Sequence, residues 1–502
     1  MRNGRVLFLT GIGIALGGPA VAADLPVKAA AVEYVKLCSA YGAGYAYVPG
    51  TDTCLRMGGY ARFDTYVNAV GTFNPAISSM AASMFTAPGG GVAGYPLETA
   101  KSPDHLTRAR AVLDLDARTA TDYGVLRSFT RFGVQWDSAA SAGSPAGSAL
   151  YFERAFVQFS GFTLGYTQSF FDAGVQYMFT QPYAGSNTWT SLIGYTLQFG
   201  NGLSATLALE DAVNRTTGVQ FGAAVGTFTG GTQFVGLNGL RYTNLEDGLQ
   251  APDLVANVRL DQVWGTVMAS GALHQVGGMI PAGFGNTQYV GEASDTSWGW
   301  AAGASAEIKL PMLAPGDSLY LQANYADGAL NYLGLSGNYQ QRATGLGSIG
   351  LTGAPATAAG GFYPIADAIW TGTAYAKESG WAVQAQFRHY WLTNLRSAIY
   401  AGYVKVEVPA NASFTAANIA RLPGAALFNA GYSVDVLQLG ANTVWSPVRN
   451  LDIGVELLYS RVDGSLPATA GIIAGTSSAG TLAVFGGSVD VWSGGLRAQR
   501  NF

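Results

Sequence analysis

The chain has 502 residues, of which 49% are hydrophobic and 12% are charged, and it contains 68 glycines. Soluble domains have about 25% charged residues, so this composition supplies little charge for the surface of a soluble protein of this length. The formal net charge is −4 at pH 7, which argues against a protein that binds nucleic acid.

Residues 1–22 have the form of a secretory signal peptide. Two arginines precede an apolar stretch at 6–16, and the small residues A-V-A at 20–22 form a cleavage site. We therefore expect an exported mature chain that begins at Ala23. Beyond the signal, the sequence has no stretch of about 18 uninterrupted apolar residues, which a membrane-spanning helix would need.

The rest of the chain shows alternation of polar and apolar residues, the pattern of strands in a transmembrane β-barrel. Residues 107–118 are the clearest example, because one set of alternate positions includes Arg108, Arg110 and Asp114 while the other is mostly apolar. One face of this strand therefore suits water, and the other suits lipid.

Tight turns alternate with longer connections rich in Gly, Ala, Ser, Thr and Asn, and together they divide the chain into strands. We predict sixteen strands near residues 55–69, 105–119, 125–136, 151–160, 163–169, 191–199, 203–212, 252–261, 264–275, 297–310, 317–327, 378–390, 395–408, 431–446, 449–463 and 484–502. The fold class is an all-β transmembrane antiparallel β-barrel spanning 55–502, with an aqueous lumen. The long connections near 70–103, 213–250 and 328–377 are expected to be exposed and mobile.

The last strand alternates and ends on Phe502. Exported chains that finish on a strand with a terminal aromatic residue look like outer-membrane β-barrels of Gram-negative bacteria. We therefore interpret Phe502 as an assembly signal for the outer-membrane assembly machinery, and we expect the barrel wall to contact outer-membrane lipid.

Several motifs resemble the alphaproteobacterial porin family. They are VEYVKLC (32–38), YGAG (41–44), PGTDTCLR (49–56), ERAFVQF (153–159), QSFFD (168–172) and ANTVWSP (441–447). The resemblance implies a homotrimeric, sixteen-stranded outer-membrane channel for passive diffusion of small hydrophilic solutes and ions. It also implies that the third long connection, near 170–190, folds into the lumen as a constriction loop.

Cys38 and Cys54 are the only cysteines, and they lie in an N-terminal segment, 23–54, that we place in the periplasm. An oxidising compartment favours a disulfide between them, worth about 3 kcal/mol in the chain-entropy model. Metal binding is the alternative, but no histidine lies nearby. We expect a structural disulfide and no metal or cofactor.

The predicted constriction loop carries a single charge, Asp172, together with polar and aromatic residues such as Tyr177 and Tyr183. Porins with an acid-rich loop differ from it, so strong cation selectivity is not expected. The parity of the first four strands places a set of charged side chains on the facing wall: Arg62, Asp64, Arg108, Arg110, Asp114, Arg127, Arg131 and Arg154.

These arginines have two interpretations. They could form an electrostatic sieve that orients solutes and biases ions, or they could pair with neighbouring carboxylates and stabilise the wall. A channel specific for sugars, with Tyr177, Tyr183 and Trp189 as an aromatic slide, is an alternative function. Tryptophans near strand ends are better explained as membrane-interface girdles.

Other classes of protein fit less well. A structural barrel or an outer-membrane enzyme remains an alternative, but the three histidines, His105, His274 and His389, have no nucleophile and acid grouped with them in the sequence, so we expect no catalytic residues. A TonB-type receptor would need about 22 strands and a plug domain, for which the chain is too short. An exported soluble β-protein is the remaining possibility.

Overall fold

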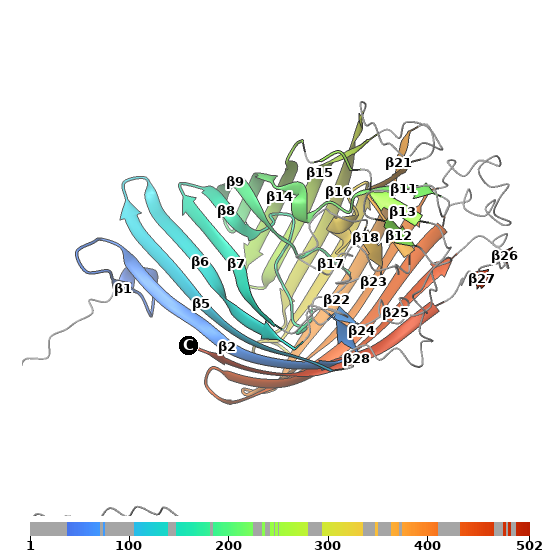
Figure 1. Ribbon diagram of the computed structural model, residues 1–502. Helices are drawn as coiled ribbons and strands as arrows, with labels where there is room; N and C mark the ends of the chain where they lie inside the picture. The colour runs from blue at the N-terminus through green and yellow to red at the C-terminus, as the bar shows by residue number, and fades with distance from the viewer. Residues whose placement is uncertain are drawn as a thin grey trace, which may run out of the picture.

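The computed structural model describes residues 38–70, 74–75, 105–138, 147–180, 184–223, 233–235, 241–244, 246–248, 250–279, 294–334, 347–349, 363–370, 374–409, 432–465, 475–477, 480–482 and 488–502. In these residues, sixteen antiparallel strands form a closed barrel (Figure 1). Its strands are β2 (Cys54–Val67), β5 (His105–Thr121), β6 (Gly124–Asp137), β7 (Gly147–Phe159), β8 (Phe162–Gln168), β9 (Trp189–Gly200), β10 (Leu203–Glu210), β14 (Asp253–Gln262), β15 (Gly265–Met279), β16 (Ser294–Lys309), β17 (Ser318–Asp327), β22 (Ser379–Leu392), β23 (Leu395–Val408), β24 (Tyr432–Val448), β25 (Leu451–Ser465) and β28 (Ser488–Asn501).

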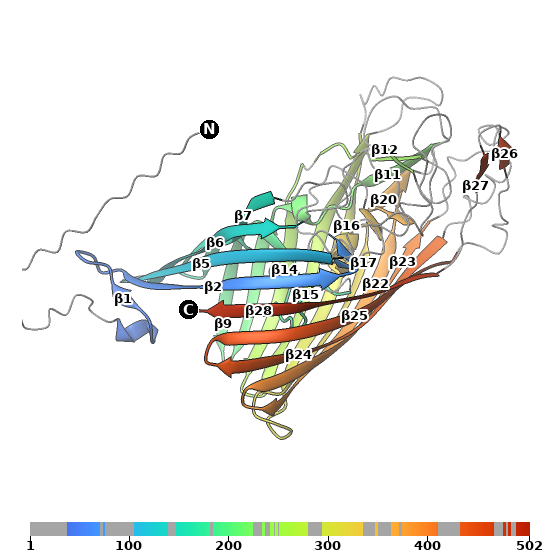
Figure 2. The ribbon, with the colours of Figure 1, turned by 60° about the horizontal axis from the view of Figure 1, so that its bottom comes forward.

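The barrel closes between its last and first strands, β28 and β2, which lie side by side (Figure 2). Beyond the end of β28, the Phe502 amide donates to the Gly59 carbonyl, and the Gly59 amide donates to the Phe502 carbonyl. Each strand pairs with the next along the chain, so every wall strand has two neighbours and no open edge remains within a membrane. The predicted strand number and closed antiparallel barrel are confirmed.

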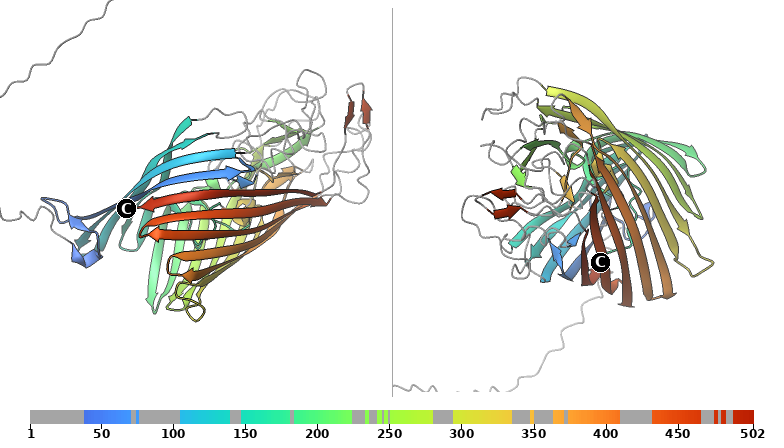
Figure 3. Two further views of the ribbon diagram at one scale, coloured as in Figure 1. Left: turned by 90° about the horizontal axis from the view of Figure 1, so that it is seen from below. Right: turned by 90° about the vertical axis from the view of Figure 1, so that its right-hand side faces the viewer.

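The two ends of the barrel differ. Tight turns join successive strands at one end, called here the turn rim, where Asn201 and Asn450 adopt positive φ values of 50° and 65°. Asparagine tolerates this left-handed conformation better than most residues. The other end, the loop rim, carries the long connections. Figure 3 shows the C-terminus at the end opposite the additional strands that belong to these connections.

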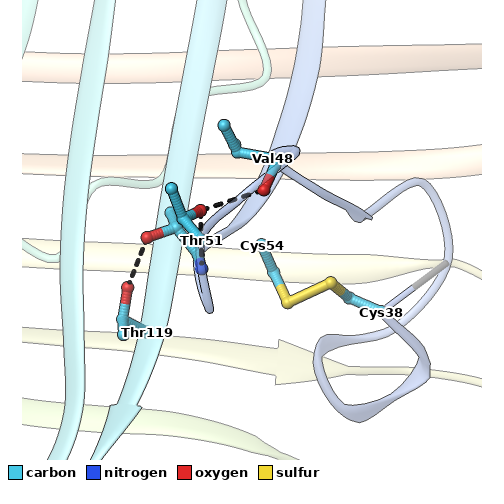
Figure 4. Close-up of a disulfide and its surroundings, with 6 residues drawn as sticks. Cys38, Val48, Thr51, Cys54 and Thr119 are labelled. Carbon is cyan, nitrogen blue, oxygen red and sulfur yellow. Dashed lines mark hydrogen bonds between the residues drawn. A yellow bond between two sulfur atoms is a disulfide. The ribbon is translucent and has the colours of Figure 1, made fainter. Parts of the chain in front are cut away.

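The predicted disulfide between Cys38 and Cys54 is present and lies at the turn rim (Figure 4). Both cysteines are buried, and their Cα atoms are 6.0 Å apart. The residues between them form a short 3-10 helix, η1 (Ser39–Tyr41), and a short strand, β1 (Ala46–Tyr47), which pairs with β2. The Tyr45 ring packs against the cysteines, and the Arg118 guanidinium lies over this ring, 5.1 Å from its centroid. The disulfide thus fixes this segment to the inner face of the rim.

The expectation that the long connections are exposed is wrong for much of what the structure describes of them. The 3-10 helices η2 (Ala212–Asn214) and η3 (Leu330–Leu333) include buried residues, and all four residues of η3 are buried. The short strands of two long connections form a second sheet: β11 (Val219–Ala223), β12 (Gln233–Val235), β13 (Arg241–Asn244), β20 (Ala368–Trp370) and β21 (Tyr375–Lys377). Most of the predicted connection at 70–103 lies outside the described residues.

Apolar residues on the inner face of the wall explain why these connections fold inward. Val404, Val406, Val434 and Val436 are buried and belong to one core cluster with the residues of η3. A water-filled pore along these valines would expose apolar surface, whereas covering them with connection residues removes that surface from water. The loop-rim half of the barrel is therefore packed on the β22–β25 side. Among the described residues, no helix is long and apolar enough to cross a membrane.

Candidate functional site: an arginine wall and a neutral loop

The described residues of the connection between β8 and β9, 169–180 and 184–188, fold into the barrel as predicted and are called here the constriction loop (Figure 1). It runs along the inner wall, where Asn257 of β14 donates to the Phe170 carbonyl at 2.5 Å, and Gln386 of β22 accepts from the Tyr177 amide at 2.8 Å. Farther along, the loop reaches Glu456 on β25. The loop thus covers the wall from β14 to β25 and leaves the opposite wall open to the lumen.

Glycines on the inner face of the wall make room for this loop. A Cβ atom at Gly454 would lie 2.6 Å from the Phe179 ring, and one at Gly440 would lie 2.7 Å from the Met178 side chain. Five wall glycines have such close contacts with loop side chains: Gly194, Gly303, Gly402, Gly440 and Gly454. Real Cβ atoms do not approach that closely, so side chains at these positions would push the loop away from the wall. Glycine at inward positions of successive strands is the sequence signal that could have located the path of the loop.

Carboxylates of the covered wall hold the loop by accepting its backbone hydrogen bonds. Glu456 accepts from the Phe179 amide at 2.5 Å, from the Thr180 amide at 3.1 Å and from the Thr180 hydroxyl at 2.9 Å. Glu210 likewise accepts from the Phe170 amide at 2.8 Å. Both glutamates are buried. The loop therefore shields acidic charge that the barrel wall would otherwise present to the lumen.

Asp172, which the sequence placed in the lumenal constriction, is instead a buried anchor of the loop. Its carboxylate lies 3.1 Å from the Arg215 guanidinium, and both side chains are fully buried. The same carboxylate accepts from the Thr188 amide at 2.6 Å. Burial by itself lowers the pKa of Arg215, but the acidic groups around it, of which Asp172 has the largest effect, together outweigh burial, so the pKa is raised. Asp172 cannot contribute to the field in the lumen, because Arg215 neutralises it out of reach of solvent.

The charged residues predicted for the facing wall lie on the inner face of β2, β5, β6 and β7. Arg62 and Arg110 are direct cross-strand partners, and so are Arg131 and Arg154. The last strand adds Arg497, which is paired with Asp64. Nine arginines and five carboxylates make up this arginine wall: Arg56, Arg62, Arg108, Arg110, Arg118, Arg127, Arg131, Arg154 and Arg497, with Asp64, Asp114, Asp116, Asp137 and Glu153.

Most of these arginines pair with carboxylates, as the structural interpretation expected. Asp64 is shared by Arg62 at 3.1 Å and Arg497 at 2.6 Å. Glu153 is likewise shared by Arg131 and Arg154. Because one carboxylate often serves two guanidinium groups, the pairing removes only part of the positive charge. The two interpretations are therefore compatible: the ion pairs order the wall, and the surplus of arginine leaves it positive.

Arg110 differs from its neighbours, because the described residues place no carboxylate in ion-pair contact with it. Its Nη2 donates to Gln135 Oε1 at 2.6 Å, and its guanidinium lies 3.8 Å from the centroid of the Tyr151 ring. A neutral amide and an aromatic face hold the guanidinium in place while leaving its charge uncompensated. Arg110 is the least compensated cation of the arginine wall.

Two of the three residues of the candidate aromatic slide, Tyr177 and Trp189, lie among the described residues, and both contact polar groups of the wall. The Tyr177 hydroxyl donates to Glu307 at 2.7 Å and also contacts the Ser318 hydroxyl at 2.7 Å, so it is held against the wall. The Trp189 ring lies 5.8 Å from the Arg154 guanidinium. Tyr183 lies outside the described residues.

The histidines are placed in different surroundings. His274 is fully buried, with Nδ1 2.7 Å from Asp253 and Nε2 3.6 Å from Asp367, an acidic grouping that the sequence did not suggest because Asp367 comes from a distant connection. It joins a long connection to the wall. His389 packs edge-on against the Trp391 ring and contacts Asp317 at 2.6 Å, near the turn rim. His105 contacts the Thr65 hydroxyl at 2.6 Å.

Replacing Glu456 with Gln is expected to loosen the constriction loop and to increase the noise of the open-channel current. The side-chain amide of Gln would face the backbone amides of Phe179 and Thr180 with an NH2 group or a single neutral acceptor, and hydrogen bonds to a charged group contribute about 1.5–3 kcal/mol each. Single-channel recording measures the noise. Glu407→Gln is the control, because Glu407 is exposed and pairs with Lys405 at 3.2 Å, away from the loop. Equal noise in the two variants would contradict the anchoring role.

A closed barrel of this size, with a loop folded against one inner wall and charged residues on the other, defines the class of outer-membrane porins. The family model described as the Porin subfamily matches residues 24–483, and the chain belongs to this porin family. The fold and the family place the protein in the outer membrane of Gram-negative bacteria.

Individual relatives agree with this membership. Porin Omp2b of Brucella canis is 29% identical over 262 residues, a match that covers 50% of this chain and 60% of the relative. Porin Omp2b of Brucella suis is 30% identical over 263 residues, with the same coverage. The match thus spans less than two thirds of these curated relatives. The outer-membrane channel DcaP of Acinetobacter baumannii has a similar fold, with a TM-score of 0.53 and 15% identity over 91% of this chain and 99% of that chain.

Proposed function

We propose that this protein is a general diffusion porin, a water-filled channel through which small hydrophilic solutes and ions cross the outer membrane, and that it favours anions. Membership of the porin family supports a channel rather than an enzyme. The observation that carries the anion preference is the asymmetry of the lumen. The constriction loop covers Glu210 and Glu456 on one wall, while the other wall holds nine arginines against five carboxylates.

The electrostatic argument follows from which charges reach water. Buried, paired charges such as Asp172 and Arg215 contribute little to the potential of the lumen, because they cancel at short range. A surplus of cations on a lumenal wall concentrates anions and repels cations, and the narrow, low-dielectric surroundings strengthen this field. The cation surplus, strengthened by the narrow lumen, therefore favours the passage of anions such as chloride.

The proposal includes the assembly of the channel. We propose export with removal of residues 1–22, recognition of Phe502 by the outer-membrane assembly machinery, and association into a homotrimer in outer-membrane lipid. The Phe502 side chain is 64% exposed at the turn rim, next to β2, which is compatible with recognition from outside the barrel. The trimer rests on the resemblance to the porin family.

Recording from the detergent-extracted protein in a planar lipid bilayer with a potassium chloride gradient tests the proposal. The expected result is ohmic current steps that close in thirds under voltage, with a reversal potential of the sign that chloride preference gives. Folded protein that does not conduct would overturn the diffusion channel. A reversal potential of the opposite sign would overturn the anion preference alone.

A further inference from the structure

A second lumenal feature, outside most of the arginine wall, lies under the constriction loop on the side of the turn rim. It is a cavity of about 230 Å³ between loop residues 176–179 and the inner faces of β22–β25 and β28, called here the recess. The loop forms its roof, and residues near the turn-rim ends of the strands form its floor. A solute that passes the constriction meets the recess next.

The recess carries a positive charge. Arg388 of β22 has no carboxylate partner among the described residues; its Nη2 donates to the Ser318 hydroxyl at 3.1 Å, and its guanidinium lies 4.5 Å from the Tyr177 ring. Among the residues that the structure describes, Arg497 pairs only with Asp64, and Arg62 shares this carboxylate. Arg396 and Asp452 also line the recess, but they pair with each other at 2.7 Å and cancel.

The chemistry of the lining restricts the solutes that would bind. Arginine presents a planar fork of donors that fits a carboxylate, and the aromatic rings beside Arg388 and Arg497 hold both guanidinium groups in place. Around them lie the side-chain amides of Asn442 and Gln499, which are groups that hydrogen bond to alcohols. Sites for drug-sized ligands have volumes of about 300–1,000 Å³, so the smaller recess suits a small solute.

We propose that the recess is a binding subsite for small hydroxylated carboxylates, that is, sugar acids, within the channel. The inference rests on the proposed function, because it requires solutes to enter the lumen. Arg388 binds the carboxylate, Arg497 supplements its charge, and the side-chain amides of Asn442 and Gln499 bind the hydroxyls of the solute. Such a solute occupies the recess, and the open channel is transiently blocked while it is bound.

Single-channel recording with gluconate as the probe tests this proposal. In potassium chloride, gluconate added from the turn-rim side is expected to produce brief current blocks whose frequency rises and then saturates with concentration. Uncharged glucose at the same concentrations is expected to produce fewer blocks. Arg388→Gln is expected to raise the half-blocking concentration of gluconate about tenfold, the effect of losing about 1.4 kcal/mol of binding free energy.

Arg259→Gln is the matched control. Arg259 is a partly exposed arginine of β14 that pairs with Asp261 at 2.8 Å and lies outside the recess, so its replacement removes one cation from another part of the barrel. An equal loss of gluconate block in both variants, or equal block by gluconate and glucose, would overturn the recess as a carboxylate site. Chloride conductance without gluconate block would overturn the subsite but not the channel, whereas absence of conductance would overturn both.

Discussion

Replacing Arg131 with Gln, or Arg110 with Gln, is expected to shift the reversal potential in a salt gradient toward cations by a similar amount. Arg131 contacts Asp114 at 2.5 Å and Glu153 at 3.1 Å, so its removal leaves Asp114 without its guanidinium partner. Replacing Arg110 leaves no carboxylate without a partner, because the Arg110 guanidinium is held by the Gln135 amide and the Tyr151 ring. Each replacement removes one positive charge: the group of Arg131, Arg154, Asp114 and Glu153 goes from neutral to a net charge of −1, and the Arg110 site goes from +1 to neutral.

Coulomb's law gives the size of the effect. One elementary charge acting on an ion at roughly 10 Å in water contributes about 0.4 kcal/mol, which corresponds to about a twofold change in the local ion concentration. The anion-to-cation permeability ratio should therefore fall about twofold or more in each variant. Zero-current potentials measured in low salt give this ratio, because high salt screens the field.

Arg461→Gln is the control for these two variants. Arg461 is an exposed arginine that pairs with Asp463 at 2.8 Å outside the arginine wall, so it carries the same charge without access to the constriction. A reversal potential that moves equally in all three variants would show that net charge alone acts. If the reversal potential shifted in neither wall variant, the arginine wall would not determine the selectivity.

Replacing Arg215 with Met should strongly destabilise the folded protein. The guanidinium is fully buried against Asp172, and removing one partner of a buried ion pair costs about 3–5 kcal/mol because the other charge stays buried without compensation. The measurement is the urea concentration at which the folded, fast-migrating form on a gel converts to the unfolded form.

The double variant Asp172→Leu with Arg215→Met separates loss of the pair from loss of side-chain packing. Replacement of a buried ion pair by apolar residues of similar volume is often neutral, so the double variant is expected to recover most of the stability. If the single variant were as stable as the double variant, Asp172 would not depend on Arg215. The comparison does not require the channel to conduct, so it tests the anchor independently of function.

The strands and the inner face of the wall could be predicted from the sequence alone. Alternation has a period of two and is local, so the positions of Arg62, Arg110 and Arg131 on one face follow from the residues around them. The disulfide could be predicted because an exported chain with a single pair of cysteines has only one intramolecular pairing. A barrel followed because every membrane-spanning strand must pair on both edges.

The path of the constriction loop was decided only by the tertiary structure. Phe179 is held by Glu456, 277 residues away, and Tyr177 by Gln386, 209 residues away. Neither contact leaves a mark in the composition of the loop itself. The same reason explains the error for Asp172: the only charge of the loop looked lumenal, but its partner Arg215 lies in the next long connection.

The sequence by itself thus determined the class of fold, the number of strands and the strand face that carries the arginines, because these depend on local periodicity and on the pairing that a bilayer imposes. The tertiary structure decided which charges remain exposed to solutes. Covering Glu456 while leaving Arg110 uncovered depends on where the loop packs. That packing depends on many long-range contacts, including those between the loop and the wall glycines. No single segment of the chain therefore predicts it.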